Sequence, residues 1–469
     1  MQLLLPITSK INNENHLEVG GLDVINLANK YKTPLYLIDV NTVKHQCREY
    51  KESFKDANFE TEIIYASKAF NCIAMCQLID KEGLSIDVST GGELFIVLKS
   101  GYDPSKVYFH GNNKSLEEIK YGIKNKVGCF IVDNFEELNN LDKIAGKFGV
   151  KQEIMIRVTP GIHASTHEYI QTGKEKSKFG FNISSGIAME AVKLALSKKN
   201  LKLIGIHSHI GSQIFNVEPY EKLVGIQLKF ISDVEKQTSY EIETINIGGG
   251  LGVKYVAQDN PTSIKDFAQL IISSVNNYSL KNKVKIKKLM LEPGRSIIGN
   301  AGISVYKVGT IKKIPNVHNY ISVDGGMSDN IRPILYGAKY SAFIANKMNL
   351  MGLRAEDKEK GNDDISNWTD NTFKDKPIYK MGLEKYTIVG KHCESGDILI
   401  EDELLPEVAV NDYIVLATTG AYCYSMSSNY NGQPRPAVVA IKDGLDQVWI
   451  ERESYRDLIK NHKELVLDN

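Results

Sequence analysis

Between about residue 34 and residue 294 the chain alternates short β-branched runs with amphipathic segments, and this pattern restricts its possible folds most strongly. Such a regular succession of strand and helix is typical of parallel βαβ units. Helical periodicity is clear in PYEKLVGIQLKFISDVEK and SIKDFAQLIISSV. The predicted strands are YLIDV, EIIYASK, LSIDVS, KVYFHG, CFIVD, IMIRVTP, LIGIHSHIG, TINIGGG and KLMLEPG.

Helix-capping signals follow three of these strands. Thr90-x-x-Glu93, Ser115-x-x-Glu118 and Asn134-x-x-Glu137 each stand shortly after a strand. A Ser, Thr or Asn followed three residues later by Glu is a signature of a helix N-terminus. The three signals therefore predict that a helix begins at each of these points.

The number of predicted strands decides between two α/β folds. Nine strands are one too many for a closed (β/α)8 barrel, but if YLIDV lies outside, the run from EIIYASK to KLMLEPG supplies eight. We therefore expect an α/β chain with a TIM-like barrel. A doubly wound open sheet is the structural alternative.

The sequence pattern changes from strand–helix alternation to short extended runs after about residue 300. The extended runs ISVYKVGTIKKI, YISVDGG, DYIVLATT, PAVVAI and DQVWIERE alternate with Gly and Pro turns, which predicts a separate, mostly β domain. Residues 350–382 are polar and aperiodic, so we interpret them as an insertion or a mobile loop.

Composition excludes several classes of protein. Lys plus Arg and Asp plus Glu number 57 each, so no net charge favours nucleic acid or an anionic membrane. No apolar stretch approaches the roughly 18 residues of a membrane span, and the N-terminus lacks the basic region of a signal peptide. The six cysteines fit no metal or disulfide spacing. We expect a cytoplasmic protein.

The ends of the predicted strands carry an unusual set of polar groups. A parallel barrel places its working residues at the carboxyl ends of its strands. A catalytic mouth is therefore expected from Lys68, Asp87, His110, Arg157, His207, His209, the triplet Gly248-Gly249-Gly250, Glu292 and Arg295.

Lys68 follows the apolar run IIYAS. Burying its charge would be costly, and the simplest alternative is a side chain that extends to the surface. Its chemical use would be a Schiff base with an aldehyde cofactor.

The three glycines after TINI would let a phosphate approach backbone N–H groups, and Arg295 and Ser212 would complete a phosphate cup. They do not match the dinucleotide fingerprint, because Val253 stands where its last Gly belongs, and they could form only a tight turn.

Glu292, in LEPGR, would keep a pyridine nitrogen protonated, so that the ring accepts electrons. The alternative is a structural salt bridge with Arg157 or Arg295.

His207 and His209 lie two apart on one strand and point to the same face, so they could bind zinc, with His163, His167 and Glu168 also available. No Cys or acidic partner has convincing ligand spacing, so we expect no metal; a histidine stacked on a flat ring is the better functional interpretation. Cys393 is either a small buried hydrophobe or, in its acidic, Gly-containing turn, a working thiol.

Together these segments resemble the diaminopimelate decarboxylase family, within the pyridoxal-phosphate (PLP) enzymes that pair an alanine-racemase-like barrel with a β domain. The resemblance spans nearly the whole chain in family order. The matching stretches include YASKAF (65–70), SIDVSTGGEL (85–94), SKFGF (177–181), GIHSHIGSQI (205–214), NIGGGLG (246–252), EPGRSI (292–297), VDGGMSDNIRPILYGAKY (323–340), GKHCESGD (390–397) and GAYCYSMSSNYN (420–431).

The resemblance implies roles for matched positions. Lys68 would hold PLP, His209 would stack on its ring, and Glu292 would pair with its pyridine nitrogen. Cys393 would be catalytic and come from the second subunit of a homodimer. The cofactor would also be bound by Asp87, Arg157, Ser212, Gly248, Gly249, Gly250, Gly294, Arg295 and Tyr422, and the substrate by Arg295, Arg332, Tyr336, Glu394 and Tyr422.

The resemblance also implies a domain division. Residues 1–40 would pack with the β domain, residues 41–298 would form the PLP-binding barrel, and residues 299–469 would form the β domain with the insertion near 350–382. The family usually runs more quickly from ANKM (345–348) to the cysteine motif, so the insertion leaves the loop geometry at the mouth open.

The implied reaction is decarboxylation of meso-diaminopimelate to lysine. Competing functions are the same chemistry on ornithine, lysine, arginine or a carboxylated polyamine, and a PLP-dependent racemase. Arg332 could bind a distal substrate carboxylate, or it could form an internal salt bridge. A catalytically inactive homologue that binds a partner protein should have lost Lys68, Glu292 or Cys393, and all three are present.

Overall fold

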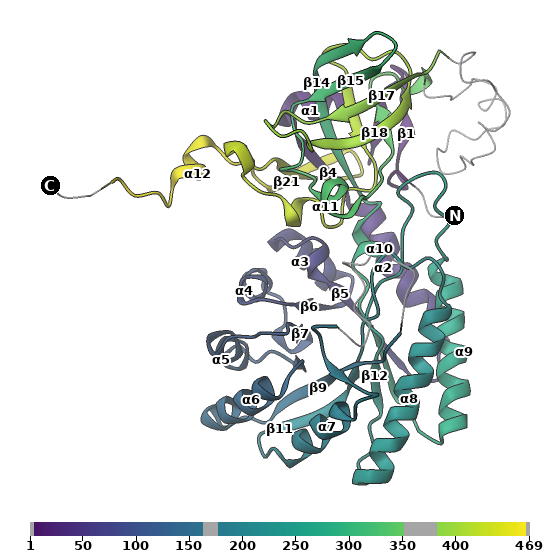
Figure 1. Ribbon diagram of the computed structural model, residues 1–469, viewed down its shortest axis with the longest axis vertical. Coiled ribbons are helices and arrows are strands. Elements are labelled where there is room, and N and C mark those ends of the chain that lie inside the picture. The colour runs from purple at the N-terminus through teal and green to yellow at the C-terminus, as the bar shows by residue number, and fades with distance from the viewer. Residues whose placement is uncertain (1–3, 163–176, 351–381, 466–469) are drawn as a thin grey trace.

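A computed structural model describes residues 4–162, 177–350 and 382–465, and shows a barrel below a strand-rich domain (Figure 1). Eight strands pair in parallel and in chain order, and the sheet closes because the last strand pairs with the first. They are β5 (Glu60–Ala66), β6 (Ser85–Val88), β7 (Val107–Phe109), β8 (Cys129–Val132), β9 (Gln152–Thr159), β11 (Leu201–His207), β12 (Thr244–Asn246) and β13 (Lys288–Leu291). The predicted (β/α)8 barrel is confirmed, and β10 (Phe181–Asn182) adds a short parallel pairing to β9.

Helices surround this barrel (Figure 1). The predicted capping signals are confirmed, since the side chains of Thr90, Ser115 and Asn134 each accept a backbone N–H from the residue three positions later. The helices are α2 (Val40–Ser53), α3 (Ile73–Lys81), α4 (Gly91–Lys99), α5 (Leu116–Lys124), α6 (Phe135–Phe148), α7 (Ile187–Ser197), α8 (Glu218–Thr238), α9 (Ile264–Asn282) and the short α10 (Arg295–Ile298).

The strand YLIDV lies outside the barrel. It forms β4 (Leu35–Asp39), which pairs antiparallel with β14 (Gly302–Ile314) and parallel with β20 (Ala437–Lys442). Both faces of β4 are buried, so its continuous apolar run is explained by a central position in the second sheet. The remaining strands of this sheet are β15 (His318–Val323), β16 (Ala342–Ile344), β17 (Glu384–Val389), β18 (Ile398–Leu405), β19 (Tyr413–Leu416) and β21 (Leu445–Ile450).

Strands β17 and β18 were missed in the sequence analysis. Both strands contain several charged residues. In β18, buried and exposed side chains do not alternate regularly, so the strand lacks a clear two-residue period. The N-terminal part forms β1 (Lys10–Ile11), β2 (Leu17–Val19), β3 (Leu22–Asp23) and α1 (Val24–Tyr31); α11 (Arg332–Tyr336) and α12 (Tyr455–Ile459) complete the helices of the described residues.

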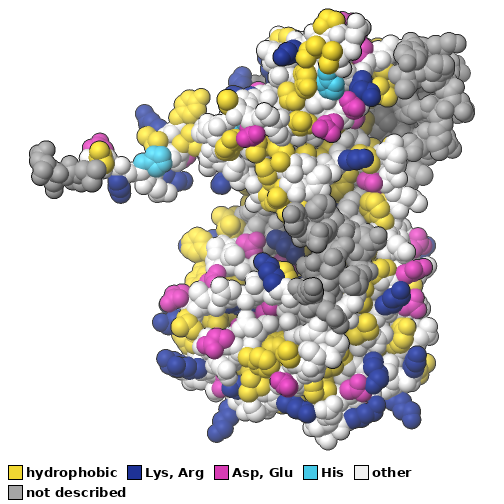
Figure 2. All heavy atoms as spheres, in the orientation of Figure 1, with side chains coloured by type: hydrophobic (Ala, Val, Ile, Leu, Met, Phe, Trp, Pro, Cys, Tyr) yellow, Lys and Arg dark blue, Asp and Glu magenta, His cyan; other side chains and the backbone are white. Residues whose placement is uncertain are grey.

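The surface offers no single-sign field on the face shown in Figure 2, where acidic and basic side chains are interspersed over the barrel. Among the described residues, no helix combines the length and apolarity needed to cross a bilayer. The predicted insertion lies almost entirely outside the described residues, as do His163, His167 and Glu168.

Candidate active site

The carboxyl ends of the barrel strands open into a cavity, which is where parallel barrels place their small-molecule sites. The barrel collects side chains that are distant in sequence, and a loop after β19 adds one from the second domain. The lining residues are Ala66, Lys68, Asp87, His209, Ser212, Gly249, Gly250, Leu251, Glu292, Gly294, Arg295 and Tyr422.

Lys68 lies in a single turn of 3-10 helix (Ser67–Ala69) directly after β5. The backbone N–H of Ser67 donates to Asp87 Oδ1 at 3.0 Å, so the end of the neighbouring strand β6 holds this turn in place. Burial and the nearby charge of Glu292 raise the pKa of Asp87 well above its usual value, while Lys68 opposes this rise. Asp87 therefore positions the turn that carries Lys68, and its raised pKa allows its carboxyl group to keep a proton beside the Lys68 amine.

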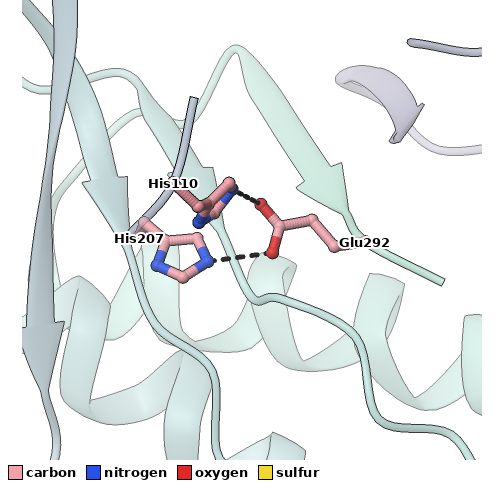
Figure 3. Close-up of side chains that lie close together, drawn as sticks. All are labelled: His110, His207 and Glu292. Carbon is pink, nitrogen blue, oxygen red and sulfur yellow. Dashed lines mark hydrogen bonds and ion pairs between the residues drawn. The ribbon is translucent and has the colours of Figure 1, made fainter. Parts of the chain in front are cut away.

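Glu292 directly follows β13 and meets two histidines from other strands (Figure 3). His207 Nε2 lies 3.0 Å from Glu292 Oε2, and His110 Nε2 lies 2.9 Å from Oε1. Asn246 Nδ2, at the end of β12, donates to Oε1 at 2.8 Å. Among the described residues, Glu292 forms no salt bridge with Arg157 or Arg295, the alternative that the sequence left open.

The electrostatics of this group favour a carboxylate. Burial alone would raise the pKa of Glu292, but His110 and His207 outweigh it, and the pKa lies well below the usual range. Burial lowers the pKa of His207 to about 4 and also lowers that of His110. Both imidazoles are therefore neutral near neutral pH, and His207 Nε2 donates to a charged acceptor.

His209 and the glycine triplet form one unit. The N–H of Gly249 donates to His209 Nδ1 at 3.2 Å, which sets the orientation of the ring beside the cavity. Gly250 has φ +120°, and a Cβ there would lie 2.3 Å from the carbonyl oxygen of Gly211. Only glycine fits this turn, so backbone N–H groups can approach a ligand directly. Burial lowers the pKa of His209 well below its usual value, and Lys68 adds to the effect.

Arg295 begins α10 and is buried without a carboxylate partner among the described residues. Its Nη2 donates to Ser212 Oγ at 2.9 Å, and Nη1 donates to the hydroxyl of Tyr255. Its guanidinium lies 4.6 Å from the centroid of the Tyr422 ring. A buried cation of this kind, beside open glycine backbone, is suited to an anion such as phosphate.

Arg332, on α11, is a second buried cation. Its guanidinium lies 5.2 Å from the Tyr336 ring centroid and 5.6 Å from that of Tyr422. Its Nε donates to the hydroxyl of Tyr340 at 3.0 Å. Within the described ranges it meets no carboxylate, so the internal salt bridge considered in the sequence analysis is absent from them.

Cys393 and Glu394 are not brought to this cavity within one chain. Both are exposed on the loop between β17 and β18. Asp397 holds that loop by accepting the N–H groups of Met327 and His392, and Asn431 accepts the N–H of Cys393. A single chain therefore presents this thiol on its surface.

Other expected residues lie close to the cavity without lining it. Gly248 has φ +70° in the turn beside His209. Arg157 is buried at the end of β9, 3.7 Å from Asp133 Oδ2 and stacked on Phe179. Asn246 and Tyr255 were missed by the sequence analysis, although an Asn at the end of the strand before the glycine triplet was an available signal.

The zinc alternative joined the wrong pair of histidines. The structure brings His207 to His110 and Glu292, with ligand atoms within 4.8 Å of one another. Of these contacts, the one between His207 Nε2 and Glu292 Oε2, at 3.0 Å, is a hydrogen bond. The donor set instead fits PLP, because it offers an amine, an anion site and a buried carboxylate for the aldehyde, phosphate and pyridine groups.

Comparison with known proteins gives a consistent result. Residues 40–299 match the family described as pyridoxal-dependent decarboxylase, pyridoxal binding domain. Diaminopimelate decarboxylase of Bacillus methanolicus is 41% identical over 96% of this chain and 97% of its own length, and that of Staphylococcus aureus is 39% identical over 97% and 99%. The crystal structure of diaminopimelate decarboxylase from M. jannaschii in complex with L-lysine is similar with a TM-score of 0.85, at 33% identity over 98% of each chain.

Proposed function

Because the chain belongs to the diaminopimelate decarboxylase family of pyridoxal-dependent decarboxylases, we propose that it converts meso-2,6-diaminopimelate into L-lysine and CO2. This reaction is the last step of lysine biosynthesis. When bound, PLP supplies an electron sink for the electron pair that the departing carboxylate leaves behind.

The assignment of residues rests on two buried guanidinium groups that lie against one aromatic ring. Neither has a carboxylate partner among the described residues. Arg295 and Arg332 lie 4.6 and 5.6 Å from the centroid of the Tyr422 ring. A buried cation needs an anion. The cofactor phosphate supplies one anion for Arg295, and a substrate carboxylate supplies one for Arg332.

Around these anions the remaining lining residues have separate tasks. Lys68 provides the amine that binds the cofactor aldehyde, and His209 packs against the ring. Ser212, with the N–H groups of Gly249 and Gly250, holds the phosphate beside Arg295, and Glu292 faces the pyridine nitrogen. Asp87 holds the turn of Lys68. Gly248, Gly294 and Arg157 complete the cofactor site.

The substrate end needs both a cation and an acid, because diaminopimelate carries a second amino acid head. Arg332 binds the distal carboxylate, with Tyr336 beside it. Glu394 binds the distal amine from the same loop as Cys393, which the second subunit contributes. Arg295 and Tyr422 touch the substrate near the reacting carbon. Lysine as a substrate would leave Arg332 without an anion, which is unfavourable in a buried site.

Cys393 donates the proton that replaces CO2, and it reaches the cavity from the second subunit of a homodimer. Its exposure on the surface of one chain supports this arrangement. All six cysteines are free, which supports a reducing compartment, and we place the enzyme in the cytoplasm.

The test is CO2 release by the purified protein with PLP from a panel of amino acids. We expect turnover of meso-diaminopimelate and little turnover of lysine, ornithine or arginine. Equal turnover of lysine or ornithine would overturn the substrate assignment, and absence of CO2 from every amino acid would overturn the function.

A further inference from the structure

Three side chains from three different strand ends surround the carboxylate of Glu292. His207 Nε2 lies at 3.0 Å from Oε2, while Asn246 Nδ2 and His110 Nε2 lie at 2.8 and 2.9 Å from Oε1. The His110 contact is the least well aligned, since its N–H does not point at the oxygen. All four residues are buried, so water does not compete for these contacts.

We propose that His207 and Asn246 are positioning residues that keep the proton shared by Glu292 and the cofactor's pyridine nitrogen on the nitrogen. This inference rests on the proposed function, because it requires PLP in the cavity. It assigns a task in the reaction to residues that touch neither substrate nor cofactor.

The number of acceptor sites supports the proposal. A carboxylate offers about four lone-pair directions. The N–H groups of His207 and Asn246 occupy one direction on each oxygen, and His110 lies against Oε1 without a hydrogen bond. Open directions remain, and the ring N–H of the cofactor fits one of them.

The relative proton affinities support it further. A carboxylate that already accepts hydrogen bonds binds an added proton less readily. Burial opposes this effect, but His207 Nε2 and Asn246 Nδ2 donate to the two oxygens at 3.0 and 2.8 Å, and the pKa of Glu292 lies well below its usual value. A proton between such a carboxylate and a pyridine nitrogen therefore stays on the nitrogen, where it makes the ring an electron acceptor.

His207 is suited to remain a neutral donor. Its side chain is fully buried, and burial lowers its pKa to about 4. Its other ring nitrogen, Nδ1, is buried and has no hydrogen-bond partner among the described residues, so a second proton there would be unsatisfied. The other charged or titratable groups near Glu292 are Asp87 on β6, Arg157 on β9, and His209 after β11.

The test measures the proton on the ring nitrogen directly. The protein is loaded with PLP labelled with 15N in the pyridine ring, and the 15N chemical shift is followed as a function of pH. We compare wild type, His207→Phe, and Asn246→Ala, which removes the donor to Glu292 without adding a charge, together with the Oδ1 that accepts the N–H of Gly248. Glu292→Gln is the positive control, and His318→Phe, which removes a histidine bonded to Thr387 in the second domain, is the matched negative control.

We expect a protonated nitrogen in wild type and in His318→Phe, and a shift toward the unprotonated value in the other three variants. The kcat should fall about tenfold for each donor removed, with a small change in KM. His207→Gln, which restores an N–H donor, should recover part of both signals.

Unchanged 15N shifts in His207→Phe and Asn246→Ala would overturn the inference, even if their kcat falls, because a purely structural role would produce that result. If His207→Phe fails to fold, Asn246→Ala alone decides. Failure of the proposed function is a separate result, since it appears as absence of CO2 release in wild type.

Discussion

The guanidinium of Arg295 lies 4.6 Å from the centroid of the Tyr422 ring, although the two residues come from different parts of the chain. Arg295 begins α10 directly after the last barrel strand, and Tyr422 lies in a loop that follows β19. Tyr422 has φ +61°, a conformation that costs a non-glycine residue energy and clusters at functional sites. Its N–H donates to the carbonyl oxygen of Ala69 at 2.8 Å, so the same residue also reaches the turn of Lys68.

Replacing Tyr422 by Ala should raise the Kd for PLP about tenfold. The substitution removes the ring from a buried guanidinium, an interaction of about 1–2 kcal/mol. Tyr422→Phe keeps the ring and should bind PLP nearly as wild type does. Fluorescence titration of the apoprotein with PLP measures both, and equal affinities in the Ala and Phe variants would show that the ring does not support the phosphate site.

Lys68→Ala should lose covalent attachment of the cofactor. After borohydride reduction, the wild-type peptide that contains Lys68 should carry the cofactor mass, and the variant should carry none. Lys193→Ala, at an exposed lysine on the outer surface, is the control. Retention of the cofactor's visible absorbance by Lys68→Ala after reduction and desalting would contradict the assignment.

Mixing inactive Lys68→Ala with inactive Cys393→Ala should restore part of the activity. Each chain supplies one intact residue, so a fraction of mixed dimers contains one complete site. The thiol of Cys393 is exposed and does not line its own chain's cavity. CO2 release is measured after subunit exchange has been demonstrated by native mass spectrometry, and no recovery at that point would argue against a shared site.

Arg332→Ala should raise the KM for meso-diaminopimelate by about 100-fold or more while the PLP spectrum stays unchanged. The loss of a charge-assisted bidentate contact in a buried site accounts for this size. Arg332→Lys should recover only part of the affinity, because an ammonium cannot make the planar contact. A KM within twofold of wild type for Arg332→Ala would exclude contact with the substrate.

Glu403 should make the protein less stable as the pH rises through about 7. Burial raises its pKa to about 7, and its side chain accepts one N–H, from Ala342. Because the folded pKa is above the unfolded value, the native state binds the proton more tightly. The stability this gives is full below the unfolded pKa of about 4.5 and is lost as pH rises through 7.

The loss amounts to the order of 2 kcal/mol. Glu403→Gln should therefore unfold at a higher Tm than wild type near pH 8 and at a similar Tm near pH 4, as measured by differential scanning fluorimetry. Glu401→Gln, at an exposed position of the same strand, should change neither. A lower Tm for Glu403→Gln near pH 8 would contradict the assignment.

Local sequence signals were sufficient for the barrel. Strand runs of alternating β-branched residues, helix caps such as Ser115-x-x-Glu118, and the eight-strand count all depend on residues close together in the chain. Because parallel strands end at one rim, the same signals predicted that Lys68, Asp87, Glu292 and Arg295 would share a cavity, and the structure brings them together.

Tertiary structure alone decided which partner each of these groups meets. The sequence left Glu292 either an arginine or a ring nitrogen as its partner, and closure of the barrel adds His207, His110 and Asn246 around it, which the sequence did not predict. Packing of the second domain onto the rim places Tyr422 against Arg295 and Arg332. Hydrophobic periodicity and helix caps predict where a helix or strand begins and which of its faces is buried. The partner of a buried charge depends instead on how strands far apart in the sequence are aligned. No local sequence pattern determines that alignment.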